Sequence, residues 1–496
     1  MAPRRTVTSA AAVTAFVLGL SAAPAGAATE GALRGPDPRA VASDIEADAL
    51  LDHLEALQAI ADANGGTRAA GTPGFEASVR YVERRLDAAG YETWRQTVPL
   101  TVEETVSSSL EYTLDRTTRV VRQIPMTASP GTPPEGVTGR VVTPEGRATG
   151  CLPRDWRGSE VNGHVALVAR GSCTFDAKSR VAAAAGATAL IVHNSTAGQL
   201  NGTLSASERR VPTVGVTLDS GRLLERLSDE AQVTVTVEKV VEQRETVNLF
   251  AEAGSGRAEG VVLVGAHLDS ATDSPGINDN GTGSMAVLET ALRLADDESL
   301  DRTVRFAWWG GGEHDHAGSR HYVEDLAADD PEGLARIGLY LDVHRIGSPN
   351  HVIGVYDADE STHPVAGTAA PAARAAERAI TDRFDSAGQP WVDLPSDTPG
   401  DHSSFIRRGV PVAGLTAGGS ETKSRSQAAA FGGTAGLAHD PNSDTVADDI
   451  DNVDASALEV LAQAAAHATV VAATDPDLAD VRDMLPTEPS GTSGRD

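Results

Sequence analysis

Hydrophobic positions in the first hundred residues follow helical spacing. Apolar side chains recur every three or four positions in residues 50–61 and again in residues 75–86, which predicts two helices with one buried face each. Asn64-Gly65-Gly66 ends the first helix and Gly90 ends the second. A strand is expected directly afterwards, at residues 92–100.

The pattern changes between about residues 106 and 245. Short runs of β-branched residues predominate there, for example at 165–169 and 233–237. A helix is predicted at 177–185, followed by a strand at 189–192. We interpret residues 106–245 as a β-rich domain that is inserted into a larger one.

From residue 248 onward, strand and helix patterns alternate. The continuous apolar run at 261–265 is typical of a strand that is covered on both faces. Further strands and helices are predicted at 282–296, 303–309, 338–344 and 455–473. This alternation favours an α/β domain with a mixed, largely parallel sheet covered by helices on both faces. The main domain would comprise residues 42–105 and 246–474.

The N-terminal segment has the order of features that marks an export signal. Arg4 and Arg5 precede an apolar run at 10–20, and Ala25-Gly26-Ala27 is a small-residue cleavage site. We therefore expect a signal peptide at 1–27 and a secreted, extracellular protein. The run is too short to anchor the chain in a membrane, and no later stretch is expected to be long and apolar enough.

The two flanking segments have loop-like compositions. Residues 28–41 are rich in Gly and Pro and are expected to form a loose leader. Residues 475–496 are rich in Pro, Asp, Ser and Gly and are expected to be disordered.

Charge and cysteine content narrow the range of partners. The formal net charge is −29 over 496 residues, so nucleic acid and anionic membranes are expected to repel the chain. The two cysteines, Cys151 and Cys173, are most simply one disulfide in an exported protein. A cysteine zinc site is implausible with only two thiols, and oxidation during export disfavours a thiol nucleophile.

Metal-capable side chains follow several predicted strands, at the edge where active sites of such sheets lie. His267 leaves a strand and Asp269 comes two residues later, which suits a metal ligand oriented by a carboxylate. The glycine-dense segment 275–283 places Asp279 at a helix start, where a carboxylate can bridge two metal ions. The plainer alternatives are a surface histidine near an aspartate and an Asn-Gly turn.

Three further segments carry similar side chains. Residues 310–316 follow the strand at 303–309, and residues 341–350 include the end of the strand at 338–344. Residues 438–444 lie near the C-terminus. Their metal-capable members include Glu313, His344 and Asp444.

Taken together, these segments resemble the secreted bacterial di-zinc aminopeptidases, which have a zinc-exopeptidase fold. The resemblance covers most of residues 42–475. The matching segments are 64–68, 71–72, 265–270, 275–283, 305–309, 318–320, 346–350 and 431–436. Residues 168–175, with Lys178 and the run 183–189, resemble a protease-associated domain, which flanks the active-site cleft in this family.

The resemblance implies a set of metal ligands, and two of them are exchanged. His267, Asp279 and Glu313 match ligands of the family, and Asp269 matches the residue that orients the first one. His344 stands where the family has an Asp ligand, and Asp444 stands where it has a His ligand. Both replacements can bind zinc, so one ion could keep His267, His344 and Asp279, and the other Glu313, Asp444 and Asp279. Aspartate is the shorter side chain, so Asp444 is expected to fall short unless its loop moves.

The family's general base is lost, because Gly312 occupies its position and has no side chain to accept a proton. Asp342 shares a strand face with His344 and is a possible substitute. Further candidates for the base follow the strand at 303–309, namely His314, Asp315 and His316. Two candidates for a substitute ligand, His402 and His439, lie at positions that correspond to other parts of the family's sequence.

The resemblance implies an enzyme that removes N-terminal residues from peptides or proteins with water activated by zinc, most simply two ions. Gly312 argues for weak or absent activity. The alternatives are a catalytically inactive family member that binds peptide or protein, and a chain that binds metal for its own sake.

Overall fold

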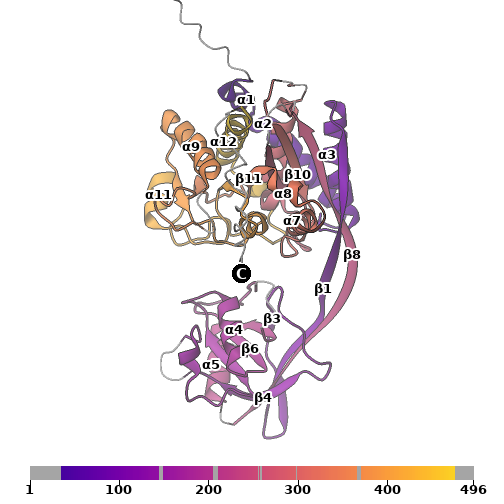
Figure 1. The fold of residues 1–496 in the computed structure, drawn as a ribbon. Helices are drawn as coiled ribbons and strands as arrows, with labels where there is room; N and C mark the ends of the chain where they lie inside the picture. The colour runs from indigo at the N-terminus through magenta and orange to yellow at the C-terminus, as the bar shows by residue number, and fades with distance from the viewer. Residues whose placement is uncertain are drawn as a thin grey trace, which may run out of the picture.

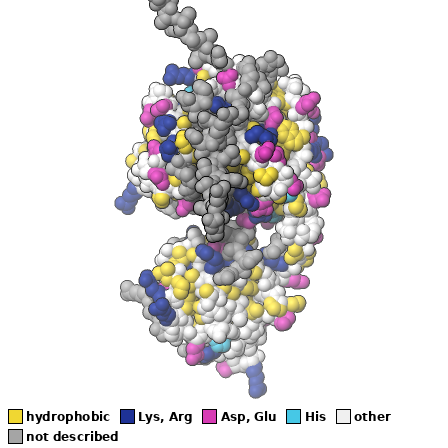
Figure 2. All heavy atoms as spheres, in the orientation of Figure 1, with side chains coloured by type: hydrophobic (Ala, Val, Ile, Leu, Met, Phe, Trp, Pro, Cys, Tyr) yellow, Lys and Arg dark blue, Asp and Glu magenta, His cyan; other side chains and the backbone are white. Residues whose placement is uncertain are grey.

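The computed structural model describes residues 35–474, except 145–148, 205–209, 229, 255, 257–259, 296, 298 and 366–369. The predicted signal peptide, most of the leader and the predicted disordered tail lie outside the described residues. Figure 1 shows two lobes joined by a long ribbon of two strands, β1 and β8. The space-filling view shows a recess between the lobes on one side (Figure 2).

The larger lobe contains a mixed sheet, as the alternating pattern predicts. Its strand order is β13-β12-β14-β11-β9-β10-β8, and β1 pairs with β8. The neighbours β10, β9, β11 and β14 run parallel, whereas β8 and β12 pair antiparallel with their neighbours β10 and β14. The strands are β1 (Thr93–Leu114), β8 (Gln232–Ala253), β9 (Val261–His267), β10 (Thr303–Trp309), β11 (Ile337–Val343), β12 (Gly354–Tyr356), β13 (Val392–Leu394) and β14 (Val412–Thr416).

Helices cover both faces of this sheet because successive strand residues point to opposite sides. Val262 and Trp308 pack in a large core with residues of α2, α3, α6, α9 and α12. Leu263 and Trp309 point the other way, into a smaller core with α7 and α10. The helices are α2 (Ala47–Ala63), α3 (Pro73–Ala88), α6 (Gly283–Arg293), α7 (Ala317–Asp329), α8 (Pro331–Ala335), α9 (Pro371–Ala387), α10 (His402–Arg407), α11 (Arg425–Phe431) and α12 (Ala455–Thr474).

The ribbon between the lobes is longer than the predicted strand at 92–100. Both β1 and β8 have 22 residues and pair antiparallel over nearly their whole length, with an irregularity between Thr105 and Ser107. The predicted domain limits at 105/106 and 245/246 therefore fall inside continuous strands. The pairing of β1 with β8 therefore continues from one lobe into the other, and neither strand is interrupted by a loop between the lobes.

The smaller lobe has its own parallel strands and two cores. β4, β5, β6 and β7 are parallel neighbours, and β3 pairs antiparallel with β7. Cys151 and Cys173 form a disulfide in this lobe, as the two cysteines suggested. Its elements are β2 (Thr117–Val120), β3 (Gln123–Pro125), β4 (Val137–Val142), η1 (Pro153–Trp156), β5 (Val165–Ala169), α4 (Phe175–Ala184), β6 (Ala189–His193), β7 (Thr213–Val216) and α5 (Leu218–Arg226).

Two expectations about the chain ends need correction. The leader was expected to be loose to residue 41, but α1 (Pro38–Ser43) begins inside it, because Asp37 caps the helix and Val41 packs in the core. No late segment was expected to suit a membrane, yet α12 is long and apolar enough by length and composition. About two thirds of its apolar stretch is buried inside the protein. Its apolar composition is therefore that of a helix that packs in the core.

Candidate metal centre

Three neighbouring parallel strands bring the predicted ligands to one edge of the sheet. β9 lies between β10 and β11. His267 is the last residue of β9, His344 directly follows β11, and Glu313 lies four residues after β10. The carboxyl ends of these strands therefore place all three side chains at the same end of the domain.

Asp279 enters the site from a tight turn before α6. It lies in the helical turn η2 (Ile277–Thr282) and precedes a cis peptide bond to Asn280. Asp448 holds this turn, since its carboxylate accepts the backbone N–H of Asn278 at 2.9 Å and of Asp279 at 3.0 Å. No role was predicted for Asp448 from the sequence. The sequence shows it only as part of an acidic run after the segment 438–444.

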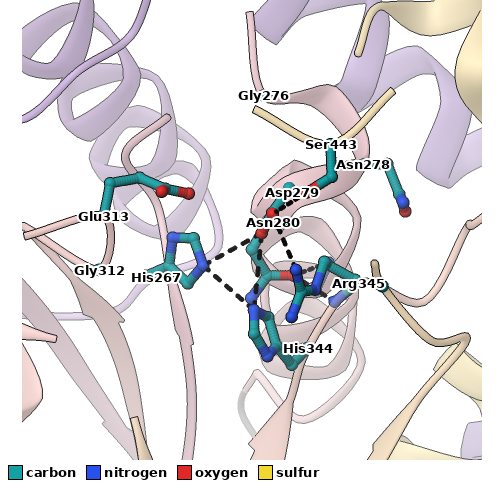
Figure 3. A network of polar contacts seen from close by, with 12 residues as sticks. His267, Gly276, Asn278, Asp279, Asn280, Gly312, Glu313, His344, Arg345 and Ser443 are labelled. Atoms are coloured by element: carbon teal, nitrogen blue, oxygen red, sulfur yellow. Dashed lines mark hydrogen bonds and ion pairs between the residues drawn. The ribbon is translucent and has the colours of Figure 1, made fainter. Parts of the chain in front are cut away.

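His267, Asp279 and His344 form a compact group that could hold a metal ion (Figure 3). The two Nε2 atoms lie 3.4 Å apart, and each is 3.5 Å from Oδ1 of Asp279. That oxygen is buried and has no hydrogen-bond partner among the described residues. Ligands of a tetrahedral zinc ion at about 2.0–2.1 Å lie about 3.3–3.4 Å from one another, so the three atoms already have the required spacing.

The ring of His267 is oriented by the main chain of Asp269. Its Nδ1–H donates to the main-chain carbonyl of Asp269 at 3.2 Å, which turns Nε2 toward Asp279. The carboxylate of Asp269 instead accepts the N–H groups of Gly311, Gly312 and Glu313. The carboxylate of Asp269 was expected to orient the histidine, but its Oδ1 lies 3.7 Å from Nδ1, farther than the main-chain carbonyl, and it holds the loop that carries Glu313.

Gly312 is packed directly against His267. A Cβ atom built at Gly312 would lie 2.3 Å from Cγ and 2.6 Å from Nδ1 of His267. These distances are far below van der Waals contact, so any side chain at position 312 would displace the imidazole ring. The absence of a carboxylate at this position is therefore linked to the present placement of His267.

A second group consists of carboxylates only. Oxygen atoms of Asp279, Glu313 and Asp444 lie within 4.8 Å of one another. Burial and then the charges of Asp444 and Asp279 raise the pKa of Glu313 well above its usual range. Burial and then Asp279 raise the pKa of Asp444 to about 6. Asp444, which was expected to fall short of a ligand position, has a left-handed φ of 61° and a carboxylate oxygen within this group.

Arg345 also reaches the centre, and sequence reasoning did not single it out. Its Nη1 donates to Oδ2 of Asp279 at 3.2 Å, and the hydroxyl of Ser443 donates to the same oxygen at 2.8 Å. The only available signal was a basic residue next to His344. The two oxygens of Asp279 thus have different surroundings, because Oδ1 faces the histidines and Oδ2 faces Arg345.

The model of peptidase family M28 matches residues 248–469, which include all five predicted metal ligands, and that of the PA domain matches residues 137–224. The "Probable lipoprotein aminopeptidase LpqL" of Mycobacterium tuberculosis is 38% identical over 443 residues, 88% of this chain and 87% of the relative. This chain belongs to peptidase family M28. An aminopeptidase of Pseudomonas aeruginosa is 36% identical over 439 residues, 86% of this chain and 80% of the relative.

Solved structures show the same fold as this M28 chain. The aminopeptidase from Aneurinibacillus sp. strain AM-1 superimposes with a TM-score of 0.65 at 24% identity, over 88% of this chain and 96% of that one. BSAP, a zinc aminopeptidase from Bacillus subtilis, gives a TM-score of 0.60 at 21% identity, over 85% and 94% of the two chains.

Asp342, the suggested substitute base, is engaged elsewhere in the M28 domain. Its buried carboxylate accepts hydrogen bonds from Tyr340 at 3.1 Å and Tyr356 at 3.2 Å, and it lies 2.7 Å from Nδ1 of His402. Burial opposes its ionisation, but the bond with His402 lowers the pKa of Asp342 to about 2. A carboxylate with these partners is a weak proton acceptor, so the structure favours an anchoring role for both Asp342 and His402.

The other candidate bases and ligands lie outside both ligand groups of the M28 centre. Asp315 pairs with Arg320 at the surface. His316 lies 3.8 Å from Asp401, and burial followed by the nearby histidines lowers the pKa of His316 to about 3. His314 and His439 are not members of either group, and burial lowers the pKa of each.

Proposed function

We propose that this M28 chain is a zinc-dependent aminopeptidase that removes residues from the N-termini of peptides. The main support is Oδ1 of Asp279, which has no hydrogen-bond partner within the described part of the chain and faces two imidazole nitrogens. Its distance to each nitrogen, 3.5 Å, is close to the distance between two ligands of a tetrahedral zinc ion. Two relatives are named aminopeptidases. Each is more than a third identical in sequence to this chain over at least four fifths of the relative's length.

The donor set suits zinc and leaves room for substrate. His267, His344 and Asp279 supply two nitrogens and one oxygen, and three protein ligands with an open fourth position are typical of catalytic zinc. A zinc ion bound there would polarise a peptide carbonyl and lower the pKa of water. A second ion would use Glu313 and Asp444 together with Asp279, as the exchanged ligands of the sequence suggest.

The chain's own contribution to proton transfer is reduced. Gly312 offers no acceptor, and a general base is worth about 10²–10⁴-fold in rate. We therefore expect turnover clearly below the value of about 10 s⁻¹ that is ordinary for enzymes. The proposal includes export of the mature chain, for which the N-terminal sequence pattern is the support.

Hydrolysis of a panel of aminoacyl-p-nitroanilides by the mature protein, with zinc supplied, tests this function. The expected result is slow release of nitroaniline that a chelator abolishes and zinc restores. The same substrates with an acetylated amino group are the matched control and should not react. No chelator-sensitive turnover on any free aminoacyl substrate would contradict the proposal and would favour a non-catalytic, peptide-binding protein.

A further inference from the structure

We propose that Arg345 supplies the positive charge on the side of the centre where a second metal ion would bind, so that the chain binds one zinc ion tightly and a second one far more weakly. The tight place is formed by His267, Asp279 and His344. The weak place is the carboxylate group of Asp279, Glu313 and Asp444. This inference rests on the proposed zinc dependence and deepens it.

A second ion would compete with two hydrogen-bond donors for one oxygen atom of Asp279. An aspartate that bridges two ions offers one carboxylate oxygen to each. Oδ1 of Asp279 is free for an ion between the histidines, but Oδ2 already accepts hydrogen bonds from Arg345 and Ser443. Figure 3 shows both donors reaching Asp279 from the side opposite His267. A second ion has to displace at least one of them.

The positive charge of Arg345 also opposes a second ion. Arg345 lies within electrostatic range of Asp279, Glu313 and Asp444, and also of Glu421. Its fixed charge therefore neutralises part of the negative potential that would attract a second cation. It also repels any cation placed among the same carboxylates, most strongly near Asp279, which is buried.

Contacts with neighbouring segments position Arg345 beside the centre. Its backbone has a left-handed φ of 49°, and its N–H donates to Oδ1 of Asn280 at 2.8 Å. Its carbonyl accepts the N–H of Ala417 at 2.8 Å. The guanidinium lies against Gly419, where a Cβ would come within 2.9 Å of Cζ of the arginine. The backbone of Arg345 is thus fixed beside the centre, and its guanidinium packs against Gly419 while it donates to Asp279.

The tight place does not suffer the same competition. Nε2 of His267 and Nε2 of His344 lie 3.4 Å apart and each is 3.5 Å from Oδ1 of Asp279, whereas Arg345 and Ser443 donate to the other oxygen, Oδ2. An ion there gains three ligands and displaces no hydrogen bond of Arg345. The structure thus predicts stepwise binding, with the first ion always on the histidine side.

Zinc titration of the metal-free full chain tests this, followed by native mass spectrometry and by competition with a fluorescent chelator. The probe is Zn²⁺ alone. In the unmodified protein we expect one tightly bound ion and a second with at least 100-fold weaker affinity. Arg345→Gln should reduce that ratio by 10-fold or more, whereas Arg345→Lys, which keeps the charge, should change it little. Arg320→Gln, which removes a surface arginine, is the matched control.

Two equally tight ions in the unmodified protein would overturn the inference, and so would an unchanged ratio in Arg345→Gln. If Arg345→Gln does not fold, the ratio in the unmodified protein and in Ser443→Ala decides, because removal of the second donor to Oδ2 should also strengthen the weak place. Failure of the proposed function is distinguishable: absence of aminoacyl hydrolysis with an intact affinity ratio would refute the activity and leave this inference standing.

Discussion

Two clusters in the larger lobe each bring carboxylates close together but differ in the other groups that contact them. One is the candidate metal centre around Asp279, and the other joins Asp357, Asp359 and Glu377. In the second cluster the carboxylates are occupied by the backbone: Asp357 accepts the N–H groups of Ser361, Thr362 and His363, and Glu377 accepts that of Ala358 at 3.0 Å.

The contrast shows that proximity of carboxylates is a poor indicator of a metal site. The Asp357 cluster holds its own loop together with hydrogen bonds and contains no nitrogen ligand. The Asp279 cluster leaves a buried carboxylate oxygen without a partner and directs two imidazoles at it. An unsatisfied buried acceptor is costly to maintain, so its presence is the stronger sign of a ligand.

The largest effect expected from this contrast follows removal of a histidine. His344→Ala takes one of three ligands from the tight place and should weaken zinc binding by more than 100-fold, with loss of chelator-sensitive turnover. Isothermal titration with Zn²⁺ measures the change. The matched variant is Asp359→Asn in the other cluster, which should leave the zinc affinity within twofold of the unmodified protein. A comparable loss in both variants would erase the distinction between the clusters.

The next effect is expected at Gly312, although this residue binds nothing itself. Gly312→Ala introduces a Cβ that overlaps the ring of His267, and such overpacking typically costs about 1–3 kcal/mol. Zinc affinity should fall by about 10-fold, and Gly312→Glu should not restore fast turnover. Gly131→Ala, whose Cβ would come no closer than 3.3 Å to a neighbour, is the control. A more active Gly312→Glu enzyme would contradict this account of the lost base.

A smaller effect on zinc is expected at Asp342. Asp342→Asn weakens the charge-assisted contact with His402, which should lower the free energy of unfolding by about 2 kcal/mol. Zinc affinity should change less than threefold, and the pH profile of turnover should keep its shape. Chemical denaturation and a kcat–pH series measure the two quantities. Abolished turnover with unchanged stability would instead identify Asp342 as the proton acceptor.

The smallest effect concerns pH and the second cluster. Burial raises the pKa of Glu377 from 4.5 to about 7, so folding favours its neutral form and stability falls as the pH rises from 4.5 to 7. Glu377→Gln should remove this loss: its Tm should match that of the unmodified protein near pH 4.5 and exceed it by about 2–4 °C at pH 8. Its zinc affinity should not change. Equal Tm values at pH 8 would refute the assignment.

Much of the fold could be predicted because hydrophobic periodicity depends on local sequence. The strands at 165–169 and 303–309 have the predicted limits, and the other predicted elements of the larger lobe, apart from the strand at 92–100, are present within a few residues. The continuous ribbon of β1 and β8 was not predictable as such. Its polar central stretch lies between the lobes, where no buried face imposes a pattern on the sequence.

The site was predictable to the extent that strand ends determine it. His267, Glu313 and His344 lie at the same edge of the sheet because they follow or end parallel neighbouring strands. The motif around Asp279 marks the turn beside them. Asp448 and Arg345 act through contacts between segments that are far apart in the chain or through an unusual backbone angle. Neither feature has a periodic signal, so only the three-dimensional arrangement reveals it.

Anomalous diffraction at the zinc absorption edge, from crystals of the full chain grown with one equivalent of Zn²⁺, tests the central claim most directly. The account predicts that the strongest peak lies about 2.0–2.1 Å from Nε2 of His267, Nε2 of His344 and Oδ1 of Asp279. A strongest peak between Glu313 and Asp444, or at Asp357 and Glu377, or no peak at either cluster, would contradict it.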